Sequence, residues 1–309
     1  MQNLSSYASS VPTRISVTIT IKNLGMPKNL YTIFSNILNE ITIQLWRKNY
    51  MNLEGVEKTM LLTIYTKAKH SQEKNHKFYD SKAIEVISKI DYDFTMAEKD
   101  KMMQMGVIGR TIVLDSMVSE YISKHPDCTI VNIASGMDTR FNRLDNGRIK
   151  WYNVDLENSA KFRLEYLPDT ERVTTLAYSA MDSKWASEIE ASEDMLFIIE
   201  GLTMYLTEQD NSEILRIIDD NFDSCTIFTE IMPPVSVENT KEVSVEETNS
   251  EFIWGLKSGK ELTGLNRHFR WVKDVNLFDG VNVYKPVFRL FTWFPLLKKR
   301  MDYIAVVEK

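Results

Sequence analysis

Five short apolar runs in the central part of the chain constrain its fold more than any other feature of the sequence. Turn residues bound each run, and segments of helical or loop character lie between them. Buried strands that alternate with helices are typical of a parallel sheet with helices on both faces. The sequence therefore predicts an α/β, Rossmann-like domain. The runs are residues 129–134, 150–154, 173–177, 195–199 and 225–231.

Further segments complete this domain. Residues 301–307 form another apolar run, which predicts a strand, and we expect residues 281–291 to pair beside it. Residues 208–218 carry apolar side chains every three or four positions, which predicts an amphipathic helix. Residues 233–267 are polar and acidic at first, and we interpret them as a lid or an insertion.

The chain before this domain has helical patterning and no strand pattern. Residues 1–27 are rich in Ser and Thr, and we interpret them as a flexible tail or arm. Asp80 is a favoured helix N-cap, and Pro126 marks the end of the last helix. The expected helices cover residues 30–45, 53–69, 80–90 and 96–123. We therefore predict a tail over 1–27, an N-terminal helical cap over 28–127, and a Rossmann-like domain over 128–309 with a lid insertion at about 233–267.

The charge balance argues against nucleic acid as a partner. The chain has 37 Lys and Arg against 43 Asp and Glu, a formal net charge of -6, whereas a nucleic-acid binder needs a basic face. Cys128 and Cys225 cannot form a disulfide framework, and neither has metal-ligand spacing. No segment resembles a signal peptide or approaches the ~20 apolar residues of a membrane span. We therefore expect a cytoplasmic protein with no metal and no membrane partner, and the sequence leaves its oligomeric state open.

Small or acidic residues follow four consecutive predicted strands. The first strand runs into a turn that contains Ser135 and Gly136, and the second ends in Asp155. The third is followed by Asp182, and the fourth by Glu200. Because the carboxyl ends of parallel strands meet at one edge of a sheet, and ligands bind outside that edge, we expect these residues to form a site.

Each of these residues also has a purely structural interpretation. Gly136 suits an ordinary turn, and Asp155 and Asp182 suit helix N-caps. Glu200 is harder to explain in this way because it directly follows an apolar run, where an unpaired carboxylate is costly. A binding site at this edge explains all four residues together.

The spacing of these residues favours a nucleoside without phosphates. An acidic residue about 20 positions beyond a glycine turn is placed to accept hydrogen bonds from ribose hydroxyls. A dinucleotide site would also need further glycines to cradle a pyrophosphate. Here the turn has one glycine, Gly136, and Asp138 would repel a phosphate. S-adenosylmethionine fits this pattern, whereas a nicotinamide-dependent oxidoreductase is disfavoured by the missing glycines.

At these residues the sequence resembles the leucine carboxyl methyltransferases and their bacterial relatives, the tetracenomycin polyketide synthesis O-methyltransferases. The resemblance extends from about Leu53 to the C-terminus, and three motifs occur in the right order at the right strand ends. Two segments upstream are also similar. The motifs are residues 131–140 (VNIASGMDTR), 151–156 (WYNVDL) and 200–206 (EGLTMYL), and the upstream segments are residues 89–94 and 109–115.

The resemblance implies a class I methyltransferase that binds S-adenosylmethionine and releases S-adenosylhomocysteine. It implies that Arg110 holds the methionine carboxylate of the cofactor, with Lys67 as a second cation. Read without the resemblance, Arg110 suits an arginine that snorkels from a helix, and Lys67 suits a solvated helix face.

The same resemblance assigns roles at the strand ends. Gly136 lets the backbone approach the amino-acid tail of the cofactor, and Asp155 takes the ribose. Asp182 takes the adenine amine, and Glu200 lies near the methionine amine. The cofactor-binding residues that it implies are Lys67, Arg110, Ser135, Gly136, Asp155, Leu156, Met181, Asp182 and Glu200.

The chain departs from its relatives at two places. Ala134 and Ser135 stand where relatives usually have a glycine followed by a small residue, so an alanine methyl group could crowd the cofactor. Glu157 stands where proline is common, which we expect to alter the loop more than the chemistry.

The expected activity is O-methylation of a carboxylate or phenolic hydroxyl on a polyketide-like or similar small molecule. The sulfonium is already an activated electrophile, so alignment of the acceptor is the main task. A carboxylate needs no general base, whereas a phenol would benefit from one. Tyr205 and Arg140 are the candidate substrate-side residues, although Tyr205 also suits packing against the next helix. The alternative function is a module with the same fold that binds the cofactor and transfers nothing.

The last third of the chain is rich in aromatic side chains, which either line an apolar pocket or form core. They are Trp254, Phe269, Trp271, Phe288, Phe291, Trp293 and Phe294.

Overall fold

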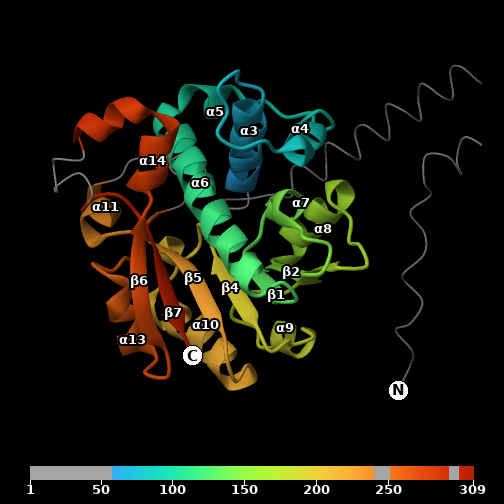
Figure 1. The fold of residues 1–309 in the computed structure, drawn as a ribbon, viewed down its shortest axis with the longest axis vertical. Coiled ribbons are helices and arrows are strands. Elements are labelled where there is room, and N and C mark those ends of the chain that lie inside the picture. The colour runs from blue at the N-terminus through green and yellow to red at the C-terminus, as the bar shows by residue number, and fades with distance from the viewer. Residues whose placement is uncertain (1–57, 240–250, 292–298) are drawn as a thin grey trace, which may run out of the picture. The chain divides into compact units, whose positions relative to one another are not determined.

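The computed structural model describes residues 58–239, 251–291 and 299–309 (Figure 1). The chain divides into two compact units, Met1–Leu53 and Glu54–Lys309. The first unit lies outside the described residues, and so do the predicted tail over 1–27 and the predicted helix over 30–45. Every helix and strand that the structure describes therefore belongs to the second unit.

A seven-stranded sheet in the order β3-β2-β1-β4-β5-β7-β6 forms the centre of this unit. Strands β1 to β5 are parallel, and β7 runs antiparallel between β5 and β6. The predicted strands from residue 129 to 231 and at the C-terminal end are confirmed, each within two residues. The strands are β1 (Thr129–Ile133), β2 (Lys150–Asp155), β3 (Val173–Ala177), β4 (Met195–Ile199), β5 (Thr226–Ile231), β6 (Arg270–Asn276) and β7 (Tyr303–Glu308).

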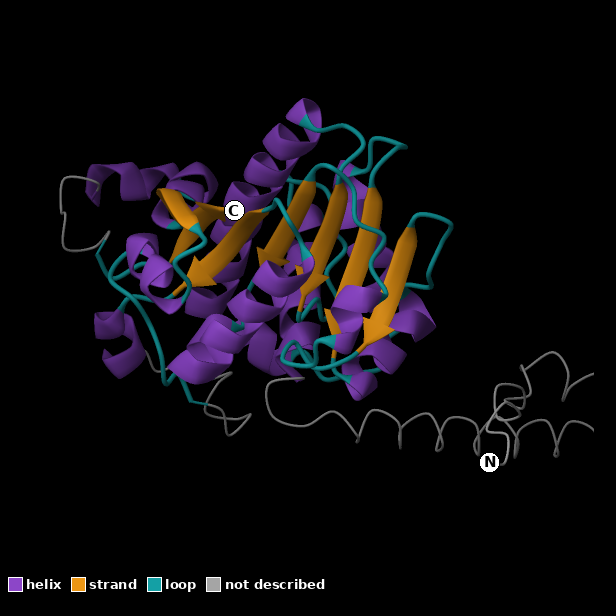
Figure 2. Ribbon diagram, turned by 90° about the horizontal axis from the view of Figure 1, so that it is seen from below, coloured by secondary structure: helices purple, strands orange, loops and turns teal. Residues whose placement is uncertain are grey.

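Helices cover both faces of the sheet, as Figure 2 shows. Two separate cores explain why β4 is apolar throughout. Leu196 and Ile198 belong to the core beneath α6, whereas Phe197 and Ile199 belong to the core beneath α10. The α-helices are α3 (Thr59–Ser71), α4 (Ser81–Ile87), α5 (Thr95–Lys99), α6 (Lys101–Lys124), α7 (Arg140–Leu144), α8 (Glu157–Tyr166), α9 (Lys184–Ser187), α10 (Glu208–Asn221), α11 (Pro234–Asn239), α13 (Leu262–Leu265) and α14 (Phe278–Tyr284). The 3-10 helices are η2 (Thr203–Tyr205), η3 (Gly259–Glu261) and η4 (Pro286–Phe291).

The register of the central strands places the first residues of three loops side by side at the edge of the sheet. Ile133 at the end of β1 pairs with Val154 of β2 on one side and with Ile199 of β4 on the other. The next residues along the chain, which include Asp155 and Glu200, therefore emerge side by side. This is also where the strand order reverses, the usual place for a ligand in an open α/β sheet.

The described N-terminal helices agree with the predicted ones except that one predicted helix is broken in two. Asp80 caps α4 as predicted, because its Oδ1 accepts a hydrogen bond of 2.8 Å from the Ala83 N–H. The predicted single helix over 96–123 is instead α5 followed by α6. Asp100 separates them because its backbone leaves the helical conformation (φ -79°, ψ 84°) and its Oδ1 accepts from the Met103 N–H at 2.9 Å.

The prediction of a strand over residues 281–291 is wrong. These residues belong to α14 and η4, and the strand that pairs with β7 is β6. The reason is close helix packing: a Cβ at Gly280 would lie 2.0 Å from the Gly109 carbonyl oxygen, so the two glycines let α14 lie directly on α6. Buried Phe278 and Val281 have helical spacing, which a short apolar segment does not reveal by itself.

The expected fold class is confirmed. The strand order, together with the N-terminal helices, is typical of a class I methyltransferase. Among the described residues, no helix is long and apolar enough to cross a membrane. The domain boundaries at residues 27 and 127 stay a prediction, and so does the lid over 233–267, of which residues 240–250 lie outside the description.

Candidate active site

A cavity of about 850 Å³ opens at the carboxyl ends of the parallel strands. Its volume lies at the upper end of the range for small-molecule sites, so it has room for a cofactor and a second ligand. Two of the eleven predicted site residues, Asp182 and Arg140, are absent from its wall. The predicted residues that line it are Lys67, Arg110, Ser135, Gly136, Asp155, Leu156, Met181, Glu200 and Tyr205.

The glycine turn after β1 is tied to the end of β2. The Gly136 N–H donates to Asp155 Oδ2 at 2.6 Å, and the Leu156 N–H donates to Oδ1 at 2.8 Å. Each carboxylate oxygen has a second lone pair, so Asp155 keeps capacity to accept from a ligand. Burial raises the pKa of Asp155, although the two backbone hydrogen bonds act in the opposite direction.

Gly136 is required by its backbone and by its surroundings. Its φ of +47° lies in the left-handed region, and a Cβ there would lie 3.0 Å from the Cβ of Met60 on α3. The helix α3 thus packs so closely over the turn that a Cβ at Gly136 would have to displace Met60.

Ala134 occupies the same unusual backbone region without being glycine. Its φ is 53°, the one positive value for a non-glycine residue in the described part of the chain. An L-residue with a Cβ is strained there by about 1 kcal/mol or more. Ala134 is therefore a strained position beside the cavity.

We expect Ala134→Gly to stabilise the protein by about 1 kcal/mol because it removes this strain. Ala68→Gly is the matched control, since Ala68 lies in the middle of α3, where glycine costs about 1 kcal/mol. Urea unfolding of both variants gives the comparison. Destabilisation by Ala134→Gly would contradict the strain argument.

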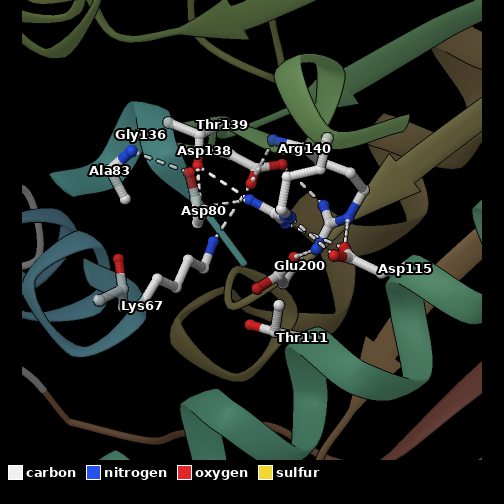
Figure 3. A network of polar contacts seen from close by, with 12 residues as sticks. Lys67, Asp80, Ala83, Thr111, Asp115, Gly136, Asp138, Thr139, Arg140 and Glu200 are labelled. Carbon is white, nitrogen blue, oxygen red and sulfur yellow. Dashed lines mark hydrogen bonds and ion pairs between the residues drawn. The ribbon is translucent and has the colours of Figure 1, made fainter. Parts of the chain in front are cut away.

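Arg140 is a buried partner of three carboxylates (Figure 3). It is not among the described residues that line the cavity. Its side chain is fully buried. Its Nε lies 2.9 Å from Asp115, its Nη1 2.7 Å from Asp138 and its Nη2 2.7 Å from Glu200. The prediction that Arg140 lies on the substrate side is corrected, because its guanidinium is ion-paired with three carboxylates of the protein.

Lys67 belongs to the same network. Its Nζ lies 3.1 Å from Asp138 Oδ1, and its side chain is 3% exposed, so it is no solvated helix face. Burial acts to raise the pKa of Asp138, but the charges of Arg140 and Lys67 outweigh it and hold the pKa below its usual range. At Glu200, burial likewise acts to raise the pKa, but the charges of Arg140 and Arg110 outweigh it and lower the pKa to about 2. Both acids are therefore ionised at neutral pH.

Arg110 stands between two acids at the edge of the cavity. Its Nε lies 2.7 Å from Glu200 Oε1, and its Nη1 lies 2.9 Å from Glu230 Oε2. Glu230 also accepts from the Gly201 N–H at 2.7 Å, and burial raises its pKa. Arg110 is thus an oriented cation and not a snorkelling one.

Glu230 is a cavity residue that the sequence did not lead us to expect. It lies within β5, it lines the cavity, and its side chain is 2% exposed. The sequence does contain a sign of its role, because a carboxylate inside an apolar run needs a partner. The same reasoning applies to Glu200.

Of the two predicted site residues after β3, only Met181 lines the cavity, and it is 37% exposed. Asp182 instead accepts from the Lys184 N–H at 3.1 Å, at the start of α9. The contact of Asp182 with adenine therefore stays a prediction. Tyr205 lines the cavity from η2, and its ring lies 5.2 Å from that of Phe252.

Most of the C-terminal aromatic side chains that are described form core. Trp254 and Phe269 are buried beneath the α10 face of the sheet, and Trp271 packs against them. Phe278, which was not among the expected residues, lines the cavity. Trp293 and Phe294 lie outside the described residues.

Comparison with known proteins agrees with this fold. The model of a family described as leucine carboxyl methyltransferase matches residues 61–219. Tetracenomycin polyketide synthesis O-methyltransferase TcmP of Streptomyces glaucescens is 24% identical over 232 residues, which cover 74% of this chain and 86% of that protein. The S-adenosyl-L-methionine-dependent methyltransferase dpfgK of Gibberella zeae is 26% identical over 246 residues, with 74% and 78% covered. The crystal structure of a duf574 family protein from Streptomyces avermitilis shares the fold, with a TM-score of 0.53 at 12% identity over 81% of this chain and 97% of that one.

Proposed function

The chain belongs to the leucine carboxyl methyltransferase family, and on this premise we propose that it is an S-adenosylmethionine-dependent O-methyltransferase whose acceptor is a carboxylate or phenolic hydroxyl of a small molecule. Dependence on S-adenosylmethionine goes with the family and the fold, and the oxygen acceptor is the finer part of the proposal. The observation that carries it is the link between Asp155 and the Gly136 turn at the wall of one large cavity.

The residues present fit the cofactor. Asp155 has free acceptor capacity for ribose hydroxyls, and Gly136 lines the cavity with backbone alone. Arg110 lines the cavity while it pairs with Glu200 and Glu230, so in this proposal the methionine carboxylate shares its guanidinium with these acids, and ionised Glu200 takes the ammonium group. Met181 is exposed toward the adenine end. Among the described residues of the cavity wall, five are acidic and three are basic, and this excess of acidic side chains suits a ligand that carries a sulfonium and an ammonium group.

The reaction places modest demands on the chain. The bound cofactor supplies an activated methyl group. The residues of the cavity hold the acceptor oxygen in line with it and exclude water. No histidine is among the described residues that line the cavity, which favours an acceptor that is already ionised, such as a carboxylate. Tyr205 is the candidate for contact with the acceptor.

Methyl transfer from labelled S-adenosylmethionine to a panel of carboxylic acids, phenols and amines tests this function. We expect label in acids or phenols and none in amines. Base hydrolysis of the product then separates the two oxygen classes, because methyl esters lose the label and aryl ethers keep it. If the protein binds the cofactor and labels no acceptor, the non-catalytic binding module is the better account.

Cofactor affinity should fall as the pH is lowered. The pKa of Asp155 lies above that of an ordinary aspartate, so Asp155 takes up a proton at higher pH than an exposed carboxylate does. Ribose hydroxyls donate to the ionised form, so protonation competes with binding. We expect the Kd for S-adenosylhomocysteine to rise as the pH falls toward the raised pKa of Asp155, before ordinary exposed aspartates take up protons. Asp155→Asn, which cannot ionise, should show a flatter profile, and equal slopes for both proteins would contradict this role.

A further inference from the structure

Gly106 is an unusual residue for its place in α6. It lies within a long helix, where glycine is about 1 kcal/mol less favourable than alanine. Gly109, one turn on, has a packing reason, since a Cβ there would lie 2.8 Å from Val281. At Gly106 a Cβ would meet no atom of the described residues within 4 Å, and the residue lines the cavity. Helix packing therefore does not explain this glycine. The absence of a side chain here leaves the cavity wider, which does explain it.

The space over Gly106 adjoins the expected position of the transferred methyl group. Gly106 precedes Arg110 by one helical turn, about 6 Å along the axis. Arg110 marks the amino-acid end of the cofactor, next to its sulfur. The face of α6 that lines the cavity runs from Arg110 through Gly106 to Met102, which is 67% exposed. An acceptor that reaches the methyl group along this face must pass over Gly106.

Apolar and adaptable side chains contribute to the cavity wall. Met102 and Met105 flank Gly106 on α6, and Met232 after β5 and Phe278 at the start of α14 line the same cavity. Methionine side chains are unbranched and polarisable, so they fit ligands of varied shape and make favourable contacts with aromatic rings. Charged side chains also line the cavity, before β7, where Arg300 and Asp302 have opposite signs.

We propose that Gly106 determines acceptor size: it leaves room beside the methyl-transfer position for a bulky apolar group, and the methionines around it let that group vary in shape. The proposal rests on the proposed function. It makes the acceptor an acid or phenol that carries a large apolar body, and it excludes small aliphatic acids as preferred substrates.

Binding of two probe acids to the protein saturated with S-adenosylhomocysteine tests the proposal. Benzoate and 2-naphthoate carry the same carboxylate and differ by one fused ring. We expect the wild-type protein to bind 2-naphthoate at least about tenfold more tightly. Gly106→Leu should weaken 2-naphthoate by about tenfold or more, with a smaller effect on benzoate, because the leucine fills the space of the second ring. Gly264→Leu is the matched control, since Gly264 lies in α13, away from the cavity, and its Cβ position is also open.

The outcomes distinguish failure of this inference from failure of the proposed function on which it rests. Failure of S-adenosylhomocysteine to bind would contradict the proposed function itself. Normal cofactor binding with equal affinity for the two acids, or an equal loss of both in Gly106→Leu, would overturn the role of Gly106. Gly106→Ala guards against misfolding: it should raise the Tm through its helix propensity while it weakens only the larger acid.

Discussion

Asp155→Asn is expected to weaken binding of S-adenosylhomocysteine by about 100-fold. The carboxylate gives charge-assisted hydrogen bonds, each worth about 1.5–3 kcal/mol. The amide that replaces it turns one acceptor oxygen into a donor, which then faces the N–H of Gly136 or of Leu156 and no longer accepts from the ribose. A loss of about 3 kcal/mol corresponds to this factor. Calorimetric titration of the wild-type and variant proteins gives the two dissociation constants.

A control variant separates this effect from a general change of charge. Asp220 lies exposed on α10, far from the cavity wall, so Asp220→Asn should leave the affinity unchanged. Equal Kd values for Asp155→Asn and the wild type would contradict the role of Asp155. A thermal melt of each protein confirms that the variant is folded before it is titrated.

Arg140→Ala should lower the free energy of unfolding by about 3–5 kcal/mol, a large part of the 5–15 kcal/mol of a typical domain. Removal of this one cation leaves Asp115, Asp138 and Glu200 without the group that they share. Each of these buried carboxylates keeps one other cation (Arg143, Lys67 and Arg110, in that order) but loses one of the two that offset its desolvation. Urea unfolding measures the effect, and Arg140→Lys should lose less because it keeps the charge.

The contrast with an exposed ion pair makes this test specific. Arg148 pairs with Asp127 at the surface, where both side chains are more than half exposed. Arg148→Ala should therefore change stability little. If Arg140→Ala is no less stable than Arg148→Ala, the buried network does not support the fold in the way described.

The sheet was predictable because its central strands are buried on both faces. Their apolar runs are continuous, and the sequence located β3 and β4 to the residue. The break at Asp100 and the helix over 278–284 were not predicted, for different reasons. A cap within a long helical stripe resembles any surface aspartate, and α14 owes its form to a glycine contact with a helix far away in the sequence.

The site was predictable as far as strand ends define it. The approach of Asp155 to Gly136 followed from the alternation of strands and turns, and the structure places both on the same cavity wall as Glu200. The burial of Arg140 could not be predicted, because its partners lie up to 60 residues away along the chain. Glu230 was not predicted because it lies inside the fifth strand and not at its end.

A crystal structure of the complex with S-adenosylhomocysteine tests the central claim most directly. We expect both ribose hydroxyls within hydrogen-bond distance of the Asp155 carboxylate, and the amino-acid tail between the Gly136 turn and Arg110. A nucleoside that lies elsewhere in the cavity, or a ribose with no contact to Asp155, would contradict the account.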